Sequence, residues 1–187
     1  MQLFKRSMEI AQTRNYFMTY ELVKETDPIL KQKCQEHIIS EETKDLVYSM
    51  IVTMQEHDGI GLAAPQVGVA ERVFVIGHRD TGYVVCINPK WEPTEDSEEE
   101  LFLEGCLSFP HLQMKVKRHN KVRCEFTDVN GVRKTSEFVG VWAQAIQHEY
   151  DHLEGVTFDE RAGSTALSIA KSKRREKLKR IGRKSKK

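Results

Sequence analysis

The residues best suited to chemistry lie in His148-Glu149-Tyr150-Asp151-His152. Histidines four positions apart lie about one turn apart on the same face of a helix, so both imidazoles can bind one metal ion. Glu149 would then lie beside that ion. The motif therefore predicts a metal hydrolase, although a polar surface turn is an alternative reading of so short a pattern.

The preceding turn supports the metal reading. Val141, Ala145 and Ile146 are apolar, so the histidines continue a face that points inward. Buried imidazoles need polar partners, and a metal ion supplies one. Two core histidines that are satisfied by hydrogen bonds alone remain the alternative.

A catalytic site of this kind needs a third protein ligand and an open position for water. Downstream candidates are Glu154, Asp159 and Glu160, but none has the spacing found in metalloproteases with this motif. Cys106 is the stronger candidate, because the glycine before it allows a thiolate and a backbone N–H to approach a ligand closely. A lone cysteine is usually a small buried hydrophobe, and this is our reading of the other three, Cys34, Cys86 and Cys124.

Helices and hairpins must position these residues. Apolar residues at helical spacing behind a serine cap, with acidic residues in the first turn, predict a helix over Ser40–His57. Val141–Gly155 is predicted as the helix that carries the histidines and ends on a glycine cap. A third helix is expected over Thr165–Arg183. Hairpins are predicted around Asp80–Gly82 and around Asn130-Gly131, and Glu92–Glu100 is expected to form an exposed loop or a frayed edge. The fold class is therefore α+β, with antiparallel sheets packed around the helix of the histidines, one helix before it and one basic helix after it.

Three segments together carry a family resemblance. GIGLAAPQ (Gly59–Gln66), EGCLS (Glu104–Ser108) and QHEYDH (Gln147–His152) resemble, in this order, the signature motifs of peptide deformylases. The similarity runs from about Met18 to about Glu160. It implies metal-dependent hydrolysis of the N-formyl group from the formylmethionine of nascent polypeptides, with release of formate.

The resemblance also implies the roles of the site residues. Cys106, His148 and His152 would be the metal ligands, and Glu149 the general acid and base. The side-chain amide of Gln66 and the backbone N–H of Leu107 would stabilise the oxyanion, although Gln66 alone reads as an ordinary loop residue. Ferrous iron is the implied ion, with Ni²⁺ or Co²⁺ as active substitutes and Zn²⁺ usually poorer.

Substrate contacts are expected on both sides of the metal. Gly59 and Gly61 allow close backbone approach, so the main chain at Ile60 and Gly61 would pair with an extended peptide, unless the glycines only form a tight turn. The pocket for the methionine side chain is assigned to Ile60, Phe102, Val141, Gln144 and Ala145.

Two glutamines and one ion pair also stand out. Gln144 lies where relatives often carry an aliphatic residue, so the pocket wall should be more polar than usual. Gln113 replaces a basic residue of many relatives. The resemblance further implies a supporting ion pair between Glu104 and Arg118 behind the ligands, with an exposed and unrelated pair as the alternative.

Charge divides the chain. Residues 1–160 contain 17 Lys and Arg against 27 Asp and Glu, whereas residues 161–187 contain 12 against one. We expect an N-terminal extension at 1–17, a catalytic domain at 18–163 and a basic helix or tail at 164–187. The tail should meet a polyanion, and the resemblance implies the ribosome and its rRNA. A disordered, solubilising end is the alternative.

Composition indicates a cytoplasmic protein. No apolar run approaches the roughly 18 to 20 residues of a membrane span, the N-terminus lacks a secretory pattern, and four scattered cysteines argue against disulfides. We expect a monomer without membrane contact. Two other functions remain open at this stage, an HExxH-type metallopeptidase and an RNA-binding protein with a structural metal.

Overall fold

The structure is a computed structural model that describes residues 18–184; the predicted extension at 1–17 and residues 185–187 lie outside the described part. Its larger sheet is antiparallel, in the order β1 (Gly61–Ala63), β2 (Val73–His78), β3 (Gly82–Pro93), β6 (Lys121–Thr127) and β7 (Arg133–Val139). A second, two-stranded sheet is the hairpin of β4 (Glu99–Cys106) and β5 (Phe109–His119).

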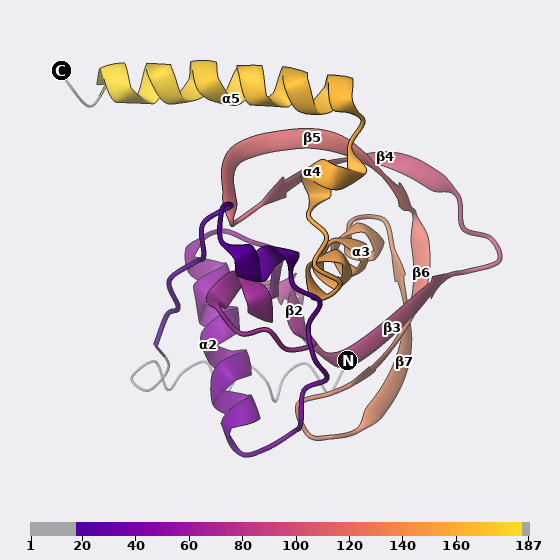
Figure 1. Cartoon of the computed structure of the whole chain (residues 1–187). Helices are drawn as coiled ribbons and strands as arrows, with labels where there is room; N and C mark the ends of the chain where they lie inside the picture. The colour runs from indigo at the N-terminus through magenta and orange to yellow at the C-terminus, as the bar shows by residue number, and fades with distance from the viewer. Residues whose placement is uncertain (1–17, 185–187) are drawn as a thin grey trace.

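Helices lie inside and outside these sheets. They are α2 (Glu42–Glu56), α3 (Val141–Leu153), α4 (Phe158–Arg161) and α5 (Ser164–Lys184), with two 3₁₀ turns, η1 (Pro28–Lys31) and η2 (Ala64–Val67). Figure 1 shows the strands curving around α3, with α2 to one side and α5 extending away from the body. The predicted α+β class with antiparallel sheets is confirmed. No described helix has the length and apolarity that a membrane crossing requires.

Helix α3 is central because one of its faces is apolar. Ala143, Ala145 and Ile146 pack with Phe74 and Ile76 of β2 in a buried cluster. Full burial of a large aliphatic or aromatic side chain stabilises a fold by about 1.5–3 kcal/mol. The helix is therefore held with its polar motif, one turn further along, against the interior.

Helix α3 ends just before the predicted glycine, Gly155. Gly155 follows the cap residue Glu154 with φ 71°, a left-handed conformation that glycine adopts without strain. A Cβ at this position would also lie 2.7 Å from the carbonyl oxygen of Lys31. The same residue therefore turns the chain and allows η1 to pack closely.

Both predicted hairpins are present. His78 pairs with Gly82 at the end of the first hairpin, and Thr127 pairs with Arg133 at the end of the second. In the second turn, Oδ1 of Asp128 accepts hydrogen bonds from the backbone N–H groups of Asn130 (2.9 Å) and Val132 (3.0 Å).

The predicted serine cap is wrong. Helix α2 begins at Glu42, and Glu41 occupies the cap position without a side-chain bond. The Ser40 hydroxyl instead donates to the Glu42 carboxylate, at 2.5 Å. A charged acceptor makes the stronger hydrogen bond, so the carboxylate wins over the capping role. The predicted acidic first turn is present, with Glu42 and Asp45.

The segment Glu92–Glu100, expected as an exposed loop or a frayed edge, is a loop only in its middle. Strand β3 continues to Pro93 and β4 begins at Glu99, so only residues 94–98 connect them. Acidic residues fit a strand here because their side chains are exposed and find cross-strand partners: Glu99 pairs with Lys117 at 2.5 Å. The segment is mainly exposed, as expected.

Candidate active site

Helix α3 and the end of β4 bring together the three predicted ligands. The donor atoms of Cys106, His148 and His152 all lie within 4.8 Å of one another. Cys106 Sγ is 3.3 Å from His152 Nε2, close to the roughly 3.5 Å between ligand atoms that a tetrahedral metal site with Cys and His ligands requires. Both histidines are buried. The donor set therefore fits a metal ion.

Glu149 lies beside this group with one oxygen free. The residue is 4% exposed, and its buried Oε2 has no hydrogen-bond partner among the described residues. Burial raises the pKa of Glu149 to about 7. Its carboxylate occupies space above Gly61, where a Cβ would lie only 2.8 Å from Cδ. Gly61 therefore allows Glu149 to lie close to the backbone, while the predicted pairing of this backbone with a peptide stays a prediction.

Gln66 points its amide at the same group. Its Oε1 accepts the backbone N–H of Ala63 at 2.9 Å, which fixes the orientation of the carboxamide. Its Nε2 then donates toward Cys106 Sγ at 3.3 Å and Ser108 Oγ at 3.5 Å. Between these two partners, Leu107 packs its side chain near Gly59. The structure therefore places Gln66 and Leu107 next to the ligands.

The two histidines differ in their surroundings. Burial lowers the pKa of His148, but hydrogen bonds with Cys106 and Glu104 outweigh it and hold the pKa well above its usual value. Burial, followed by repulsion from His148 and Arg118, lowers the pKa of His152 well below its usual value. The negative groups around His148 favour positive charge, while His152 favours the neutral imidazole that binds metals.

A charged network supports His148. Its Nδ1 donates to Glu104 Oε2 at 2.9 Å, and Glu104 also accepts from Arg118 Nε at 2.8 Å and Nη2 at 3.1 Å. Burial raises the pKa of Glu104, but the bonds from His148 and Arg118 bring it below its usual value. The predicted ion pair between Glu104 and Arg118 is confirmed, and both side chains are buried.

Sequence reasoning missed three supporting residues. Asp151 accepts from Arg118 Nη1 at 2.6 Å and from Arg161 of α4. The ring of Phe158 of α4 packs against that of His148, with 5.7 Å between the ring centroids. Asp151 could have been found, because it lies three residues after His148 on the buried face of a helix.

The alternative ligands lie elsewhere. Glu154 accepts from Arg72 at 2.6 Å and pairs with Lys33 at 2.8 Å. Asp159 and Glu160 hydrogen-bond to Thr157. None of the three belongs to the group of potential ligands that the described residues form. The other cysteines, Cys34, Cys86 and Cys124, are buried as expected.

The predicted pocket residues come from three places. Val141, Gln144 and Ala145 lie in the first half of α3, Phe102 is on β4, and Ile60 precedes β1. Of these five, only Ala145 belongs to an apolar cluster of the described residues, and Ile60 and Val141 are exposed. Gln113 pairs with Gly105, next to Cys106.

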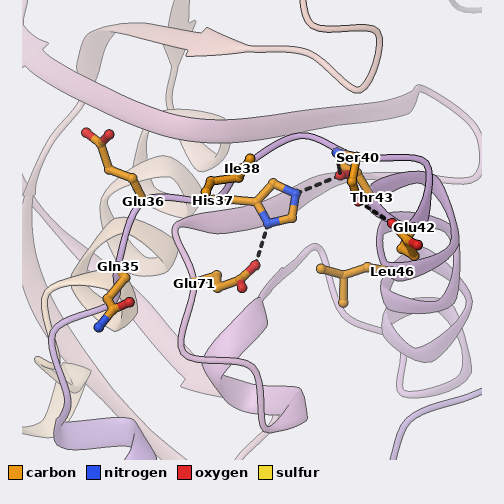
Figure 2. Close-up of a pocket in the computed structure, with 9 residues that line it drawn as sticks. All are labelled: Gln35, Glu36, His37, Ile38, Ser40, Glu42, Thr43, Leu46 and Glu71. Carbon is orange, nitrogen blue, oxygen red and sulfur yellow. Dashed lines mark hydrogen bonds and ion pairs between the residues drawn. The ribbon is translucent and has the colours of Figure 1, made fainter.

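A separate pocket of about 370 Å³ lies at the other end of α2. Figure 2 shows its lining, in which His37 bonds to Glu71 and Thr43. Helix α2 spans about 20 Å at about 1.5 Å per residue, so this pocket is far from the turn that leads to Gly61. None of the predicted site residues lines it.

Comparison with known proteins identifies the family. Residues 19–167 match the family described as polypeptide deformylase. This chain belongs to the polypeptide deformylase family. It is 48% identical over 134 residues to peptide deformylase 1 of Clostridium perfringens (strain 13 / Type A), covering 71% of this chain and 90% of that protein. It is 42% identical over 151 residues to the peptide deformylase of Dictyoglomus thermophilum, covering 80% and 97%.

Solved peptide deformylases share the fold. The Synechococcus elongatus enzyme in complex with actinonin matches with a TM-score of 0.78 and 37% identity, over 83% of this chain and 85% of that one. The Acinetobacter baumannii enzyme with Met-Ala-Ser bound matches with a TM-score of 0.72 and 32% identity, over 78% and 99%. The chain is accordingly a hydrolase that removes the N-formyl group from nascent peptides. The family is metal-dependent, and Cys106, His148 and His152 could hold the ion.

Proposed function

We propose that Cys106, His148 and His152 hold one divalent ion, Fe²⁺ in the cell, and that Glu149 transfers protons during deformylation. The observation that carries this proposal is the buried cluster of three donor atoms with the unpartnered Glu149 oxygen beside it. A thiolate and two imidazoles suit several metals, and the family resemblance supports ferrous iron among them.

A bound divalent ion would act as a Lewis acid and lower the pKa of a coordinated water toward about 7. Glu149 accepts a proton from the attacking water, whose oxygen bonds to the formyl carbon. The C–N bond then breaks, and Glu149 returns the proton to the amine nitrogen. The products are formate and a peptide with a free N-terminus.

Gln66 and Leu107 stabilise the oxyanion that forms on the formyl oxygen. The Gln66 amide is already oriented by Ala63 and directed at Cys106, so it needs no reorganisation when charge develops. Removal of one donor of this kind typically costs about 3–4 kcal/mol of transition-state stabilisation. The backbone N–H of Leu107 would be the second donor.

The peptide would bind along the edge of β1. Within the described residues β1 pairs only with β2, which leaves its other edge for an extended substrate at Ile60 and Gly61. The methionine side chain would enter between β4 and the first half of α3, among Ile60, Phe102, Val141, Gln144 and Ala145. The complex of the Acinetobacter baumannii enzyme with Met-Ala-Ser supports a short methionine-first peptide as the test substrate.

Formate release from formyl-Met-Ala-Ser tests these roles, with metal content measured by elemental analysis after anaerobic purification. Glu149→Ala should lose about 10²- to 10⁴-fold in rate and keep its metal. Cys106→Ala should lose both metal and activity. Retention of metal and activity in Cys106→Ala would exclude the thiolate as a ligand, and near-normal activity of Glu149→Ala would exclude the acid–base role.

We also propose that α5 docks this enzyme, a cytoplasmic monomer, on the rRNA of the ribosome. Leu167 and Ala170 anchor the first half of α5 in the apolar cluster beneath β5, and Arg174 pairs with Glu25 at 2.6 Å. The second half extends beyond the body (Figure 1) and is rich in Lys and Arg. A positive surface of this kind binds phosphates with strong salt dependence.

Truncation after Arg175 tests the docking while keeping the anchored half. Co-sedimentation with ribosomes at low salt should fall by about tenfold or more, because several phosphate contacts are lost. Deformylation of formyl-Met-Ala-Ser should stay within about twofold of the full chain. Sedimentation that survives the truncation, or that is insensitive to salt, would contradict the proposal.

A further inference from the structure

The short helix α4 touches the ligand group at two points. Phe158 packs against the ring of His148 and, edge-on at 5.5 Å, against Phe109. Arg161 reaches Asp151 with two hydrogen bonds, from Nη2 at 2.6 Å and from Nε at 3.1 Å. Figure 1 shows α4 between the β4–β5 hairpin and α3, and α4 contacts both strands of that hairpin.

A local capping box and contacts from η1 hold α4 in place. The backbone N–H of Thr157 donates to Glu160 at 2.9 Å, as part of a capping box. Lys31 of η1 donates to the Thr157 hydroxyl at 2.6 Å and pairs with Glu160 at 2.7 Å. The backbone that carries Arg161 toward Asp151 is therefore anchored.

Charges alternate along the line of contacts from Arg161 to His148. Asp151 lies between Arg161 and Arg118, and Glu104 lies between Arg118 and His148. The two carboxylates and Arg118 are buried, where a charge without a partner is strongly destabilising. Only Arg161, with a side chain 49% exposed, is reached easily from solvent.

We propose that Arg161 is a positioning residue for the metal ligand His148, an inference that rests on the proposed metal site. Arg161 supplies the second cation that Asp151 needs, which leaves the Arg118 fork free to hold Glu104. Without Arg161, Asp151 would draw Arg118 toward itself. Glu104 would then no longer fix the orientation of the His148 ring, and the metal would be held less tightly.

Metal affinity tests the proposal directly. The dissociation constant for Co²⁺, measured by competition with a chelator, should rise about three- to tenfold in Arg161→Gln, since loss of a direct partner of a metal ligand costs about 10- to 100-fold and Arg161 acts through two further residues. The visible absorption of the Co²⁺ protein should change as well. Arg161→Lys keeps the charge but loses the paired donors. Its affinity for Co²⁺ should therefore lie between those of the unmodified protein and Arg161→Gln.

Arg123 provides a matched control. Its side chain is 48% exposed and donates to Glu137 at 3.0 Å, on β6 and away from the network. Arg123→Gln should leave both the Co²⁺ affinity and the spectrum unchanged. The positioning role is overturned if Arg161→Gln binds Co²⁺ as tightly as the unmodified protein does. It is also overturned if Arg161→Gln and Arg123→Gln lose affinity for Co²⁺ equally.

Failure of the underlying metal assignment gives a different result. If Cys106→Ala binds Co²⁺ as tightly as the unmodified protein, the proposed metal site itself is wrong. A loss in Cys106→Ala without any loss in Arg161→Gln overturns only the role of Arg161. The Arg161→Lys variant offers the same comparison if Arg161→Gln folds poorly.

Discussion

Gly61 determines where the Glu149 carboxylate can lie. Because a Cβ at position 61 would collide with that carboxylate, Gly61→Ala should displace it, and a misplacement of about 1 Å can cost about 10²-fold in rate. We therefore expect kcat/KM for formyl-Met-Ala-Ser to fall by about that factor while metal content stays normal. Gly163→Ala is the control, since a Cβ at position 163 meets no atom within 4 Å. Unchanged kinetics in Gly61→Ala would contradict this account.

At the residue scale, the grouping of side chains was predictable from sequence where the residues are close in the chain. His148, Glu149 and His152 lie within five residues of one helix, so helical geometry alone brings them together. Cys106 lies 42 positions before His148, and only the family resemblance raised it above a buried thiol. The bond between Asp151 and Arg161 depends on how α4 returns to α3, which no local pattern encodes.

Among the elements, the β6–β7 turn depends on one carboxylate. Asp128 accepts two backbone N–H groups and pairs with Lys134 at 2.7 Å. Asp128→Ala should lower the free energy of unfolding at pH 7 by about 0.5–1.5 kcal/mol, the net contribution of a typical hydrogen bond, because the exposed N–H groups can bond to water instead. Asp128→Asn keeps an acceptor oxygen and should cost less. Equal stability of all three proteins in urea unfolding would contradict this role.

The Asp128 carboxylate should also make the free energy of unfolding depend on pH. Burial raises the pKa of Asp128, but hydrogen bonds from Lys134, Val132 and Asn130 bring it below the usual 3.8. A folded-state pKa below the unfolded one stabilises the fold above the unfolded pKa, and this contribution is lost as the pH falls through the folded pKa. The stability difference between the native chain and Asp128→Asn should therefore shrink below about pH 4, and a constant difference in urea unfolding would contradict the linkage.

Elements with a strong period were predictable, whereas the start of α2 and the strands around the second motif were not. The helices of residues 42–56, 141–153 and 164–184 and both hairpins on the large sheet were predicted. Strand β5 was missed, although Leu112, Met114 and Val116 alternate with polar residues and are buried. The start of α2 was misplaced because the Ser40 hydroxyl had a better acceptor in Glu42.

At the scale of the whole molecule, a bound ion would join two parts of the fold. Cys106 belongs to the β4–β5 hairpin, and the histidines belong to α3 inside the larger sheet. An ion at 100 times its dissociation constant adds about 2.7 kcal/mol to stability, and each kcal/mol shifts Tm by about 2–4 °C in a protein of this size. Removal of the metal with a chelator should therefore lower Tm by about 5–10 °C.

Cys106→Ala provides the control for this measurement. If Cys106 is a ligand, the chelator should leave the Tm of Cys106→Ala almost unchanged. A similar fall in Tm in both proteins would mean that the chelator acts at another site. An unchanged Tm in the native chain would mean that the ion does not join the hairpin to the helix.

Helix α5 is continuous over 21 residues, from its anchored start to its outer half. Residues 175–184 would reach about 15 Å beyond the anchor, at about 1.5 Å per residue. A flexible linker of that length would transmit only distance, whereas a helix also transmits direction. A surface that binds the outer half of α5 would therefore fix the orientation of the active site as well as its distance from that surface.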